Sequence, residues 1–414
     1  MQSLNSIDSV SSDHVATPLE PDASAAAGLP TLADNIELTI FTNIDDAEPD
    51  WRQLTTAGLG HPYQTIEWCR AYLETIGRSE GIQPIFAVGK VEGKPVVLLP
   101  LCVTRNRGVA AISFLGTDFS NQNTGLWDPD IYNAATPEIV QQFLQMICEA
   151  CCADCVLLRN VPTDWHDRPH PLVLPTAQQS PSPVYRAQLP SDFEEFYNDT
   201  HKSRARRNLA RKERNLYSAG DFKVVKCTDS AEIENALDHF LNQRDIRAQV
   251  TGIPNAFAQP DATAFLKKLL SCNQITLTGS NHPLQIWTLE VAGIIRATYI
   301  CAQGRSTIYV YSNSVAHDDM LPNSPALILA KDIIKYACES PEIDALDMGL
   351  GQERYKEAWT SPAPLCDSAL SVTLKGRLLI EWQSGKTRIK SSIRNSERLW
   401  PLVRRFRQWK AKVV

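Results

Sequence analysis

The chain contains 414 residues, of which 43% are hydrophobic, which is enough for two or three domains with substantial cores. Its formal net charge of −6 argues against a dedicated nucleic-acid-binding protein. No apolar run reaches the roughly 20 residues of a membrane-spanning helix, and the first residues lack the basic start and apolar core of a signal peptide. Because the 11 cysteines are also odd in number, we expect a cytoplasmic protein with reduced thiols.

The first part of the chain predicts a leader followed by a domain in which strands and helices mix. Residues 1–34 are rich in Ser, Ala, Asp and Pro without periodicity, which is typical of a disordered segment. The N-terminal domain is expected over residues 35–182. Its strands are predicted at 36–41, in a hairpin at 84–103 that turns at Glu92-Gly93, at 112–116 and at 155–161, and its helices at 46–55, 65–76 and 137–153.

The second part repeats this arrangement and predicts a second domain over residues 183–383. Its strands are predicted at 183–189, 222–225, 275–278, 284–291, 294–302 and 306–312, at 343–348, and in a closing hairpin at 368–375 and 376–382. Its helices are predicted at 192–217, 231–243, 262–271 and from Pro325 onward. The fold class is therefore α+β, with two similar domains that each contain a mixed, largely antiparallel sheet flanked by helices.

Asn323-Ser324-Pro325 opens an apolar helix and is the first candidate site. Asn and Ser cap helices well, and Pro fits the first turn. The free N–H groups and the positive dipole end of such a helix suit a phosphate or pyrophosphate. An ordinary, well-capped helix between two strands explains the same pattern.

Three segments, in this order, resemble the CelD/BcsL-type branch of the GNAT acyltransferase superfamily, which is related in layout to Fem-type transferases. They are Pro62–Trp68, the basic helix from His201 to Leu216, and Ser324-Pro325 followed by Asp347-x-Gly-x-Gly-x-x-x-Tyr-Lys356. The resemblance spans roughly residues 36–380. Ala326 stands where the family has Gly, and Ser312-Asn313 stands where it often has Asp. The phosphate-binding loop of ordinary GNAT enzymes is absent from the sequence.

The resemblance implies two tandem GNAT-like domains, with the catalytic site in the second. The expected activity is transfer of an acyl group, with acetyl expected first, from acetyl-CoA or another acyl-CoA to an amine or hydroxyl of a small molecule or saccharide, in polysaccharide or envelope metabolism. No metal is expected. Asp347 would orient or deprotonate the acceptor, Tyr355 would protonate the thiolate, and Lys356 would stabilise negative charge. The residues expected to bind the cofactor are Asn323, Ser324, Ala326, Gly349 and Gly351.

These residues also have structural interpretations, since Asp347 could cap a turn, Tyr355 could pack in the core and Lys356 could be a surface charge. The arginines of the basic helix recur at helical spacing, and guanidinium groups suit phosphate or carboxylate. We therefore assign substrate or phosphate binding to Arg204, Arg207, Arg211 and Tyr311. A solvated arginine face paired with acidic residues is the alternative.

The segment 384–414 combines many Lys and Arg residues with Leu, Trp and Phe. A basic amphipathic segment can contact an anionic membrane or a protein partner, or pack on its own domain. The overlapping Cys-x-x-Cys pairs of Cys148–Cys155 fall in one predicted helix-to-strand segment, so we do not expect a zinc site. Two alternative functions remain: Fem-like aminoacyl transfer from charged tRNA, and a degenerate, non-catalytic scaffold.

Overall fold

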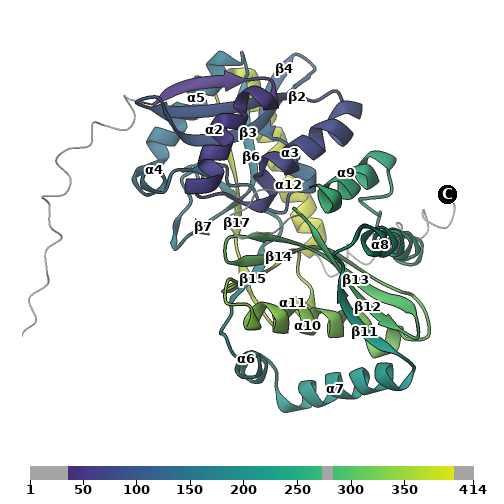
Figure 1. The fold of residues 1–414 in the computed structure, drawn as a ribbon. Coiled ribbons are helices and arrows are strands. Elements are labelled where there is room, and N and C mark those ends of the chain that lie inside the picture. The colour runs from purple at the N-terminus through teal and green to yellow at the C-terminus, as the bar shows by residue number, and fades with distance from the viewer. Residues whose placement is uncertain (1–35, 273–282, 396–414) are drawn as a thin grey trace, which may run out of the picture.

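The structure, a computed structural model, describes residues 36–272 and 283–395. The predicted leader, the predicted strand at 275–278 and residues 396–414 of the predicted tail lie outside the described residues. Figure 1 shows two bodies, the upper one mainly purple and blue and the lower one mainly green, and each is built on one large mixed sheet. No helix in the described part of the chain has the length and apolar character needed to cross a membrane.

The sheet of the first body has the strand order β1-β2-β3-β4-β6-β17-β9, with β5 beside β3. All its pairs are antiparallel except β4 with β6. The strands are β1 (Glu37–Phe41), β2 (Gln83–Val91), β3 (Lys94–Asn106), β4 (Val109–Phe114), β5 (Leu126–Trp127), β6 (Cys155–Pro162), β9 (Gln178–Gln179) and β17 (Leu365–Ser371). The predicted hairpin turn at Glu92-Gly93 is confirmed, because β2 and β3 pair directly across it.

Alternate residues of each strand face opposite helix layers. Phe86 and Val88 pack in the cluster that contains helices α2 (Ile44–Ala57) and α3 (Ile66–Tyr72). Ile85 and Ala87 pack instead with helix α5 (Pro137–Ala150). Two short strands, β7 (Asp164–Trp165) and β8 (Arg168–Pro169), and the helix α4 (Pro129–Ala134) complete this body, and Tyr132 and Trp165 pack in the same cluster as α5.

The second sheet has the order β11-β12-β13-β14-β15-β10-β16, with β14 and β15 parallel. Its strands are β10 (Val184–Gln188), β11 (Phe222–Lys226), β12 (Gln285–Val291), β13 (Ile294–Gly304), β14 (Thr307–Val315), β15 (Ala345–Leu350) and β16 (Ser361–Ala363). Helices α8 (Ser230–Thr251) and α9 (Pro260–Ser271) cover one face, and α6 (Phe193–Thr200), α7 (Ser203–Ser218) and α10 (Pro325–Glu339) cover the other. The predicted fold class, two mixed sheets flanked by helices, is confirmed.

The two bodies contain the same order of elements. Each half of the chain also contributes a strand to the sheet of the other body. Strand, two helices, three strands, helix and strand occur from β1 to β6 and again from β11 to β15. The chain crosses from the first sheet to the second between β9 and β10, and returns between β16 and β17. Residues 365–395 therefore lie with the first body, whereas the sequence pattern predicted that residues up to 383 belong to the second domain.

Two predicted elements differ from the structure. The closing hairpin is wrong, because β17 is followed by helix α12 (Leu374–Asn395), in which Leu374, Leu378 and Trp382 recur at four-residue spacing. The single helix predicted at 192–217 is two helices, because the chain is extended at His201 and Lys202.

One apolar cluster joins the bodies. The Trp68 ring of α3 lies edge-on to Phe265 of α9 and to Tyr311 of β14, with ring centroids 5.2 Å apart in both pairs. The polar residues Gln122, Asn123 and Thr124 of the first body are also completely buried. The ends of β14 and β15 are therefore held against the first body by apolar and polar contacts together.

Candidate active site

Strand β14 is irregular on both of its edges at one point. Against β13, Val310 pairs with Cys301 and Ser312 with Ile300, so Tyr311 is the extra residue of a β-bulge. Such a residue is left out of the hydrogen-bond ladder. Against β15, the parallel pairing ends at Tyr309 and Asp347. The bulge therefore lies immediately beyond the point where β14 and β15 separate.

The backbone at Gly349 of β15, beside the bulge, has a geometry that requires glycine. Its φ of +72° favours glycine, and an added Cβ would lie 2.7 Å from the Val310 carbonyl oxygen. Gly351 also has a positive φ, of +93°, but an added Cβ there would meet nothing within 4 Å. The two glycines of the Asp-x-Gly-x-Gly motif thus shape the end of β15.

Tyr355 reaches across the separated strands from the short helix α11 (Arg354–Glu357). Its hydroxyl accepts a hydrogen bond of 3.0 Å from Asn313 Nδ2 on β14 and interacts with the buried hydroxyl of Tyr299. Burial raises the pKa of Tyr355 above its usual value. The phenol therefore keeps its proton at neutral pH and is placed to donate it between the two strands.

The Lys356 side chain supports the backbone in place of presenting a free charge. Its Nζ donates hydrogen bonds of 2.7 Å to the Leu350 carbonyl and 3.5 Å to the Gly349 carbonyl. The side chain is buried, and burial lowers its pKa. Lys356 thus fixes the turn that follows β15 and thereby the position of its neighbour Tyr355.

Asp347 is 1% exposed and fully engaged in hydrogen bonds. Its Oδ2 accepts from Arg186 Nε and from Gln122 Nε2, both at 2.8 Å, and its Oδ1 accepts from Gly349 N at 2.7 Å. Arg186 also donates to the Gln122 side-chain oxygen. The carboxylate therefore ties the end of β15 to Arg186 of β10 and to Gln122 of the first body, and its expected role of orienting or deprotonating the acceptor stays a prediction.

The N-terminus of α10 is formed differently from the predicted side-chain cap. Ser324 is the N-cap but has φ +54° and makes no capping hydrogen bond; its Oγ accepts from Lys212 Nζ at 2.6 Å. Asn323 Oδ1 accepts from Asn215 Nδ2 at 3.0 Å. Both donors belong to α7, so a lysine ammonium lies at the positive end of α10. Ala326 lies in the first turn of that helix.

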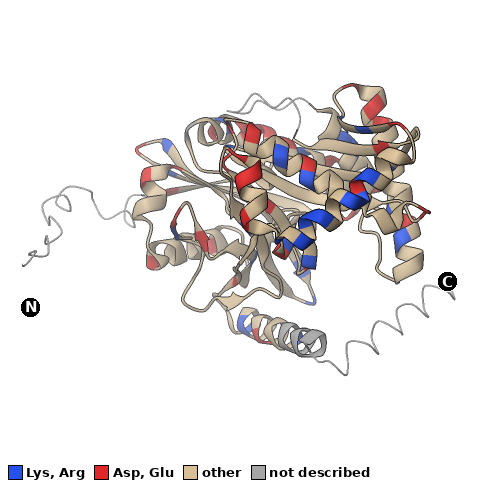
Figure 2. Ribbon diagram, turned by 90° about the horizontal axis from the view of Figure 1, so that it is seen from below, with Lys and Arg blue, Asp and Glu red and all other residues tan. Residues whose placement is uncertain are grey.

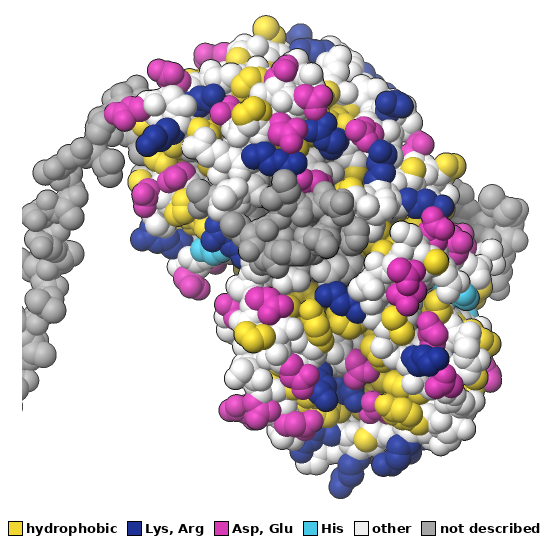
Figure 3. All heavy atoms as spheres, in the orientation of Figure 1, with side chains coloured by type: hydrophobic (Ala, Val, Ile, Leu, Met, Phe, Trp, Pro, Cys, Tyr) yellow, Lys and Arg dark blue, Asp and Glu magenta, His cyan; other side chains and the backbone are white. Residues whose placement is uncertain are grey.

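The arginines of α7 face solvent except for Arg206, which is half-buried. Leu209 and Leu216 are the buried residues of this helix, and the predicted anion-binding side chains Arg204, Arg207 and Arg211 are exposed. Figure 2 shows the blue turns of α7 from below, and Figure 3 shows Lys and Arg side chains gathered at the lower end of the molecule. No hydrogen bond or ion pair within the described residues joins these arginines to Tyr311, whose hydroxyl donates to the Phe119 carbonyl at 3.0 Å.

Sequence reasoning missed four residues at this site. Gln122, Arg186, Asn313 and Arg244 contact Asp347, Tyr355 or the bulged strand. Arg186 had a local signal, because it is a lone charge in the middle of a predicted strand. The other three contact residues that are far away in the sequence.

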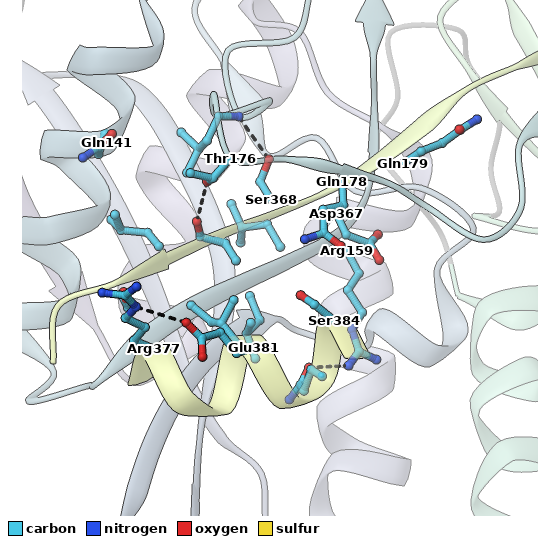
Figure 4. Close-up of a pocket in the computed structure, with 18 residues that line it drawn as sticks. Gln141, Arg159, Thr176, Gln178, Gln179, Asp367, Ser368, Arg377, Glu381 and Ser384 are labelled. Carbon is cyan, nitrogen blue, oxygen red and sulfur yellow. Dashed lines mark hydrogen bonds and ion pairs between the residues drawn. The ribbon is translucent and has the colours of Figure 1, made fainter. Parts of the chain in front are cut away.

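The first body contains an equivalent strand pair, but a helix covers it. Strands β4 and β6 are parallel only from Ala111–Cys155 to Ser113–Leu157. Helix α12 packs across them so closely that a Cβ on Gly376 would lie 2.1 Å from the Asp154 carbonyl oxygen. Cavities of about 330 Å³ and about 1020 Å³ flank this helix. Figure 4 shows the smaller one, between α12 and strands β6 and β17. The second body is therefore the better candidate for catalysis.

No group of three or more His, Cys, Asp or Glu side chains within residues 36–272 and 283–395 is arranged to hold a metal ion. The four cysteines between Cys148 and Cys155 are free, and Cys148 and Cys155 are buried.

Comparisons with known proteins find similarity in the second body and in the overall fold. A family model for the acetyltransferase (GNAT) domain matches residues 203–357, which include the bulge, α10 and α11. No curated protein sequence matches the chain. The crystal structure of FemX is similar over 84% of this chain and 99% of that chain, at 11% identity and a TM-score of 0.54.

Two further structures are similar with lower scores. A conserved protein of unknown function from Bacteroides thetaiotaomicron has 11% identity and a TM-score of 0.48, over 81% of this chain and 100% of that chain. A tandem GNAT protein from the clavulanic acid biosynthesis pathway has 11% identity and a TM-score of 0.41, over 81% and 99%. Residues 203–357 are thus similar to GNAT acetyltransferase domains, in a chain whose fold is similar to that of FemX.

Proposed function

We propose that this protein is an acyltransferase that takes its acyl group from an acyl-CoA, with acetyl-CoA as the expected donor. The observation that carries the proposal is the bulge at Tyr311, at the point where β14 leaves β15. A backbone N–H that is not used by the ladder can donate to the thioester carbonyl oxygen and stabilise the charge that develops on it.

The reaction then needs a proton for the leaving group. The amine or hydroxyl of the acceptor attacks the thioester carbon, the C–S bond breaks, and the sulfur leaves as a thiolate. Tyr355 donates its hydroxyl proton to this thiolate, and a proton released by the acceptor through solvent restores the phenol. Asn313 holds the Tyr355 hydroxyl in place at 3.0 Å. Asp347 and Lys356 act by positioning β15 and the turn that follows it.

The donor's pyrophosphate is proposed to bind at the start of α10. Asn323, Ser324 and Ala326 surround the helix N-terminus, whose N–H groups and dipole favour anions. Lys212 adds a positive charge 2.6 Å from Ser324 Oγ. Gly349 and Gly351 keep the opposite strand end free of side chains. These residues are the proposed cofactor-binding set.

The acceptor and subfamily rest on the sequence resemblance. It favours the CelD/BcsL-type branch and a small-molecule or saccharide acceptor in polysaccharide metabolism. The basic segment 384–414 is proposed to contact an anionic membrane or a protein partner; its first residues form the end of α12. Whether the transfer is to nitrogen or oxygen depends on that acceptor.

One observation favours a second candidate function. The exposed arginines of α7 present a cationic surface that suits a donor rich in phosphate, such as charged tRNA. In that case the acyl group would be an aminoacyl group, and the same bulge and Tyr355 would serve the reaction.

Calorimetric titration of the full chain with acetyl-CoA tests the proposal. We expect wild-type binding, and about tenfold weaker binding in Ala326→Asp, because a carboxylate in the first turn of α10 repels phosphate while it favours the helix dipole. Lys335→Ala, on the exposed side of the same helix, is the matched control and should bind normally. No heat in the wild-type protein, or unchanged binding by Ala326→Asp, contradicts the proposed donor site. Binding of charged tRNA in its place would favour the second candidate.

A further inference from the structure

Arg244 of α8 is held rigidly beside the bulged strand. Its Nη1 donates to Ser312 Oγ at 3.1 Å and to the Asn313 carbonyl at 3.2 Å, and its Nε donates to Asn255 Oδ1 at 3.2 Å. Its guanidinium carbon lies 5.7 Å and 5.5 Å from the ring centroids of Phe240 and Phe257. These contacts use Nε and Nη1, and no hydrogen bond of Nη2 is found within the described residues.

This guanidinium has no ion-pair partner among residues 36–272 and 283–395. Two other arginines of the second body, Arg296 and Arg186, do have one: Arg296 lies 2.6 Å from Asp318, and Arg186 lies 2.8 Å from Asp347. Asp245 and Glu353 influence Arg244 only at longer range, and the Asp245 carboxylate accepts from Asn255. A desolvated charge without a counter-ion is costly unless a ligand supplies the counter-ion.

Arg247 adds a second charge next to the first. It follows Arg244 by three residues on α8, a spacing that places two side chains on the same helix face. Both are half-buried, and no ion pair within the described part of the chain involves Arg247. Burial, and after it the charge of Arg247, lowers the pKa of Arg244, which agrees with two cations close to each other. Arg247 also acts on Tyr355 through its charge.

We infer that Arg244 and Arg247 bind an anionic group, a carboxylate or a phosphate, on the acyl acceptor. The inference rests on the proposed function, because it takes Tyr355 and the bulge as the reaction centre. Neighbouring guanidinium groups suit planar or tetrahedral oxyanions. The acceptor class is therefore an amine or alcohol that also carries an acidic group.

The proposed anion site and the proposed donor site lie on opposite faces of the second sheet. Ser312, which Arg244 contacts, pairs with Ile300, and Ile300 packs in the cluster of α8 and α9. Helix α10, whose N-terminus is the proposed phosphate site, packs on the opposite face with Tyr299. An acceptor at the two arginines and a donor at α10 would therefore meet between the separated strands from opposite faces.

The test compares acceptors that differ only in their charged group. Thiol release from acetyl-CoA is measured with β-alanine against β-alaninamide, and with glucosamine 6-phosphate against glucosamine, in wild type, Arg244→Gln and Arg247→Gln. We expect at least one anionic acceptor to exceed its neutral partner in kcat/KM by about tenfold or more. The two pairs distinguish carboxylate from phosphate. Both variants should lose this preference while they bind acetyl-CoA normally, and Arg78→Gln, on an exposed residue of the first body, should keep it.

The inference is overturned if neither anionic acceptor is preferred, or if both variants keep the preference. Arg247→Gln keeps the test valid should Arg244→Gln fail to fold, because Arg247 makes no ion pair within the described residues. A donor-free measurement separates the inference from the proposed function. Inorganic phosphate, against chloride at equal ionic strength, should raise the melting temperature of wild type more than that of either variant, whether or not acetyl-CoA binds. An equal rise in all three proteins overturns the anion site.

Discussion

Gln122 Nε2 donates a hydrogen bond to Asp347 Oδ2 at 2.8 Å, so a buried residue of the first body holds the strand end of the second. Arg186 completes the contact from the neighbouring strand. In Asp347→Ala the Arg186 guanidinium and the Gln122 amide would lose the carboxylate that accepts their hydrogen bonds inside the protein. We expect the free energy of unfolding to fall by about 3 kcal/mol, measured by urea denaturation.

Lys335→Ala breaks an exposed pair on α10 and should change that free energy by less than about 0.5 kcal/mol. An unfolding midpoint of Asp347→Ala equal to that of wild type would contradict a stabilising effect of the Gln122–Asp347 contact between the bodies.

Tyr355→Phe tests the proposed proton donor. Loss of the hydroxyl should slow thiol release from acetyl-CoA by about 100-fold, since general acid catalysis contributes at least that much, while the dissociation constant for acetyl-CoA stays the same. Because burial raises the pKa of Tyr355, the wild-type rate should not fall through ionisation of this group between pH 7 and pH 9. Tyr217→Phe, on an exposed tyrosine of α7, is the control. A normal rate in Tyr355→Phe would assign the proton to another group.

Gly376→Ala tests the packing of α12 on the first sheet. The new Cβ would lie 2.1 Å from the Asp154 carbonyl oxygen, so the helix must move, and we expect a loss of more than about 1 kcal/mol in stability. Gly385 lies in the same helix and has nothing within 4 Å of an added Cβ. Gly385→Ala should therefore raise stability by up to about 1 kcal/mol. Equal effects of the two changes on thermal unfolding would contradict this packing.

Because His170 is buried, we expect the protein to lose stability in mild acid. Burial lowers its pKa to about 3, whereas the unfolded chain has the ordinary value near 6.5. The unfolded state therefore binds more protons below pH 6.5, and stability falls as the pH decreases from 6.5 towards 3, by at most about 1.4 kcal/mol per pH unit from this group. His61, whose pKa is also lowered by burial, adds to the effect.

In His170→Asn the side-chain oxygen can replace Nδ1 as acceptor for the Leu172 N–H. This variant should lose less stability than wild type between pH 7.5 and pH 5 in urea titrations. A loss equal to that of wild type would mean that His170 is protonated in the folded state.

The sequence predicted the regular elements well where the local pattern is strong. The apolar run of β3 and the apolar face of α10 both appear as expected. The error at α12 arose because a short apolar run fits both a strand and a helix. The four-residue spacing of Leu374, Leu378 and Trp382 was the signal for the helix.

The site was predicted less completely, for a physical reason. Tyr355 was found from its motif, but the partners of Asp347 are 225 and 161 residues away, so no local pattern indicates them. The expectation that Asp347 orients or deprotonates the acceptor did not include its hydrogen bonds to Gln122 and Arg186, which only folding brings together. The bulge at Tyr311 likewise depends on how β13 and β14 pair.

Hydrogen–deuterium exchange of the full chain, with and without acetyl-CoA, tests the central claim that the donor binds between β14 and β15. We predict slower exchange of backbone amides in 307–315, 323–329 and 347–356 when acetyl-CoA is present. The equivalent segments of the first body, 109–114 and 155–162, should exchange at the same rate in both conditions. Protection confined to the first body, or no protection at saturating acetyl-CoA, would contradict the account.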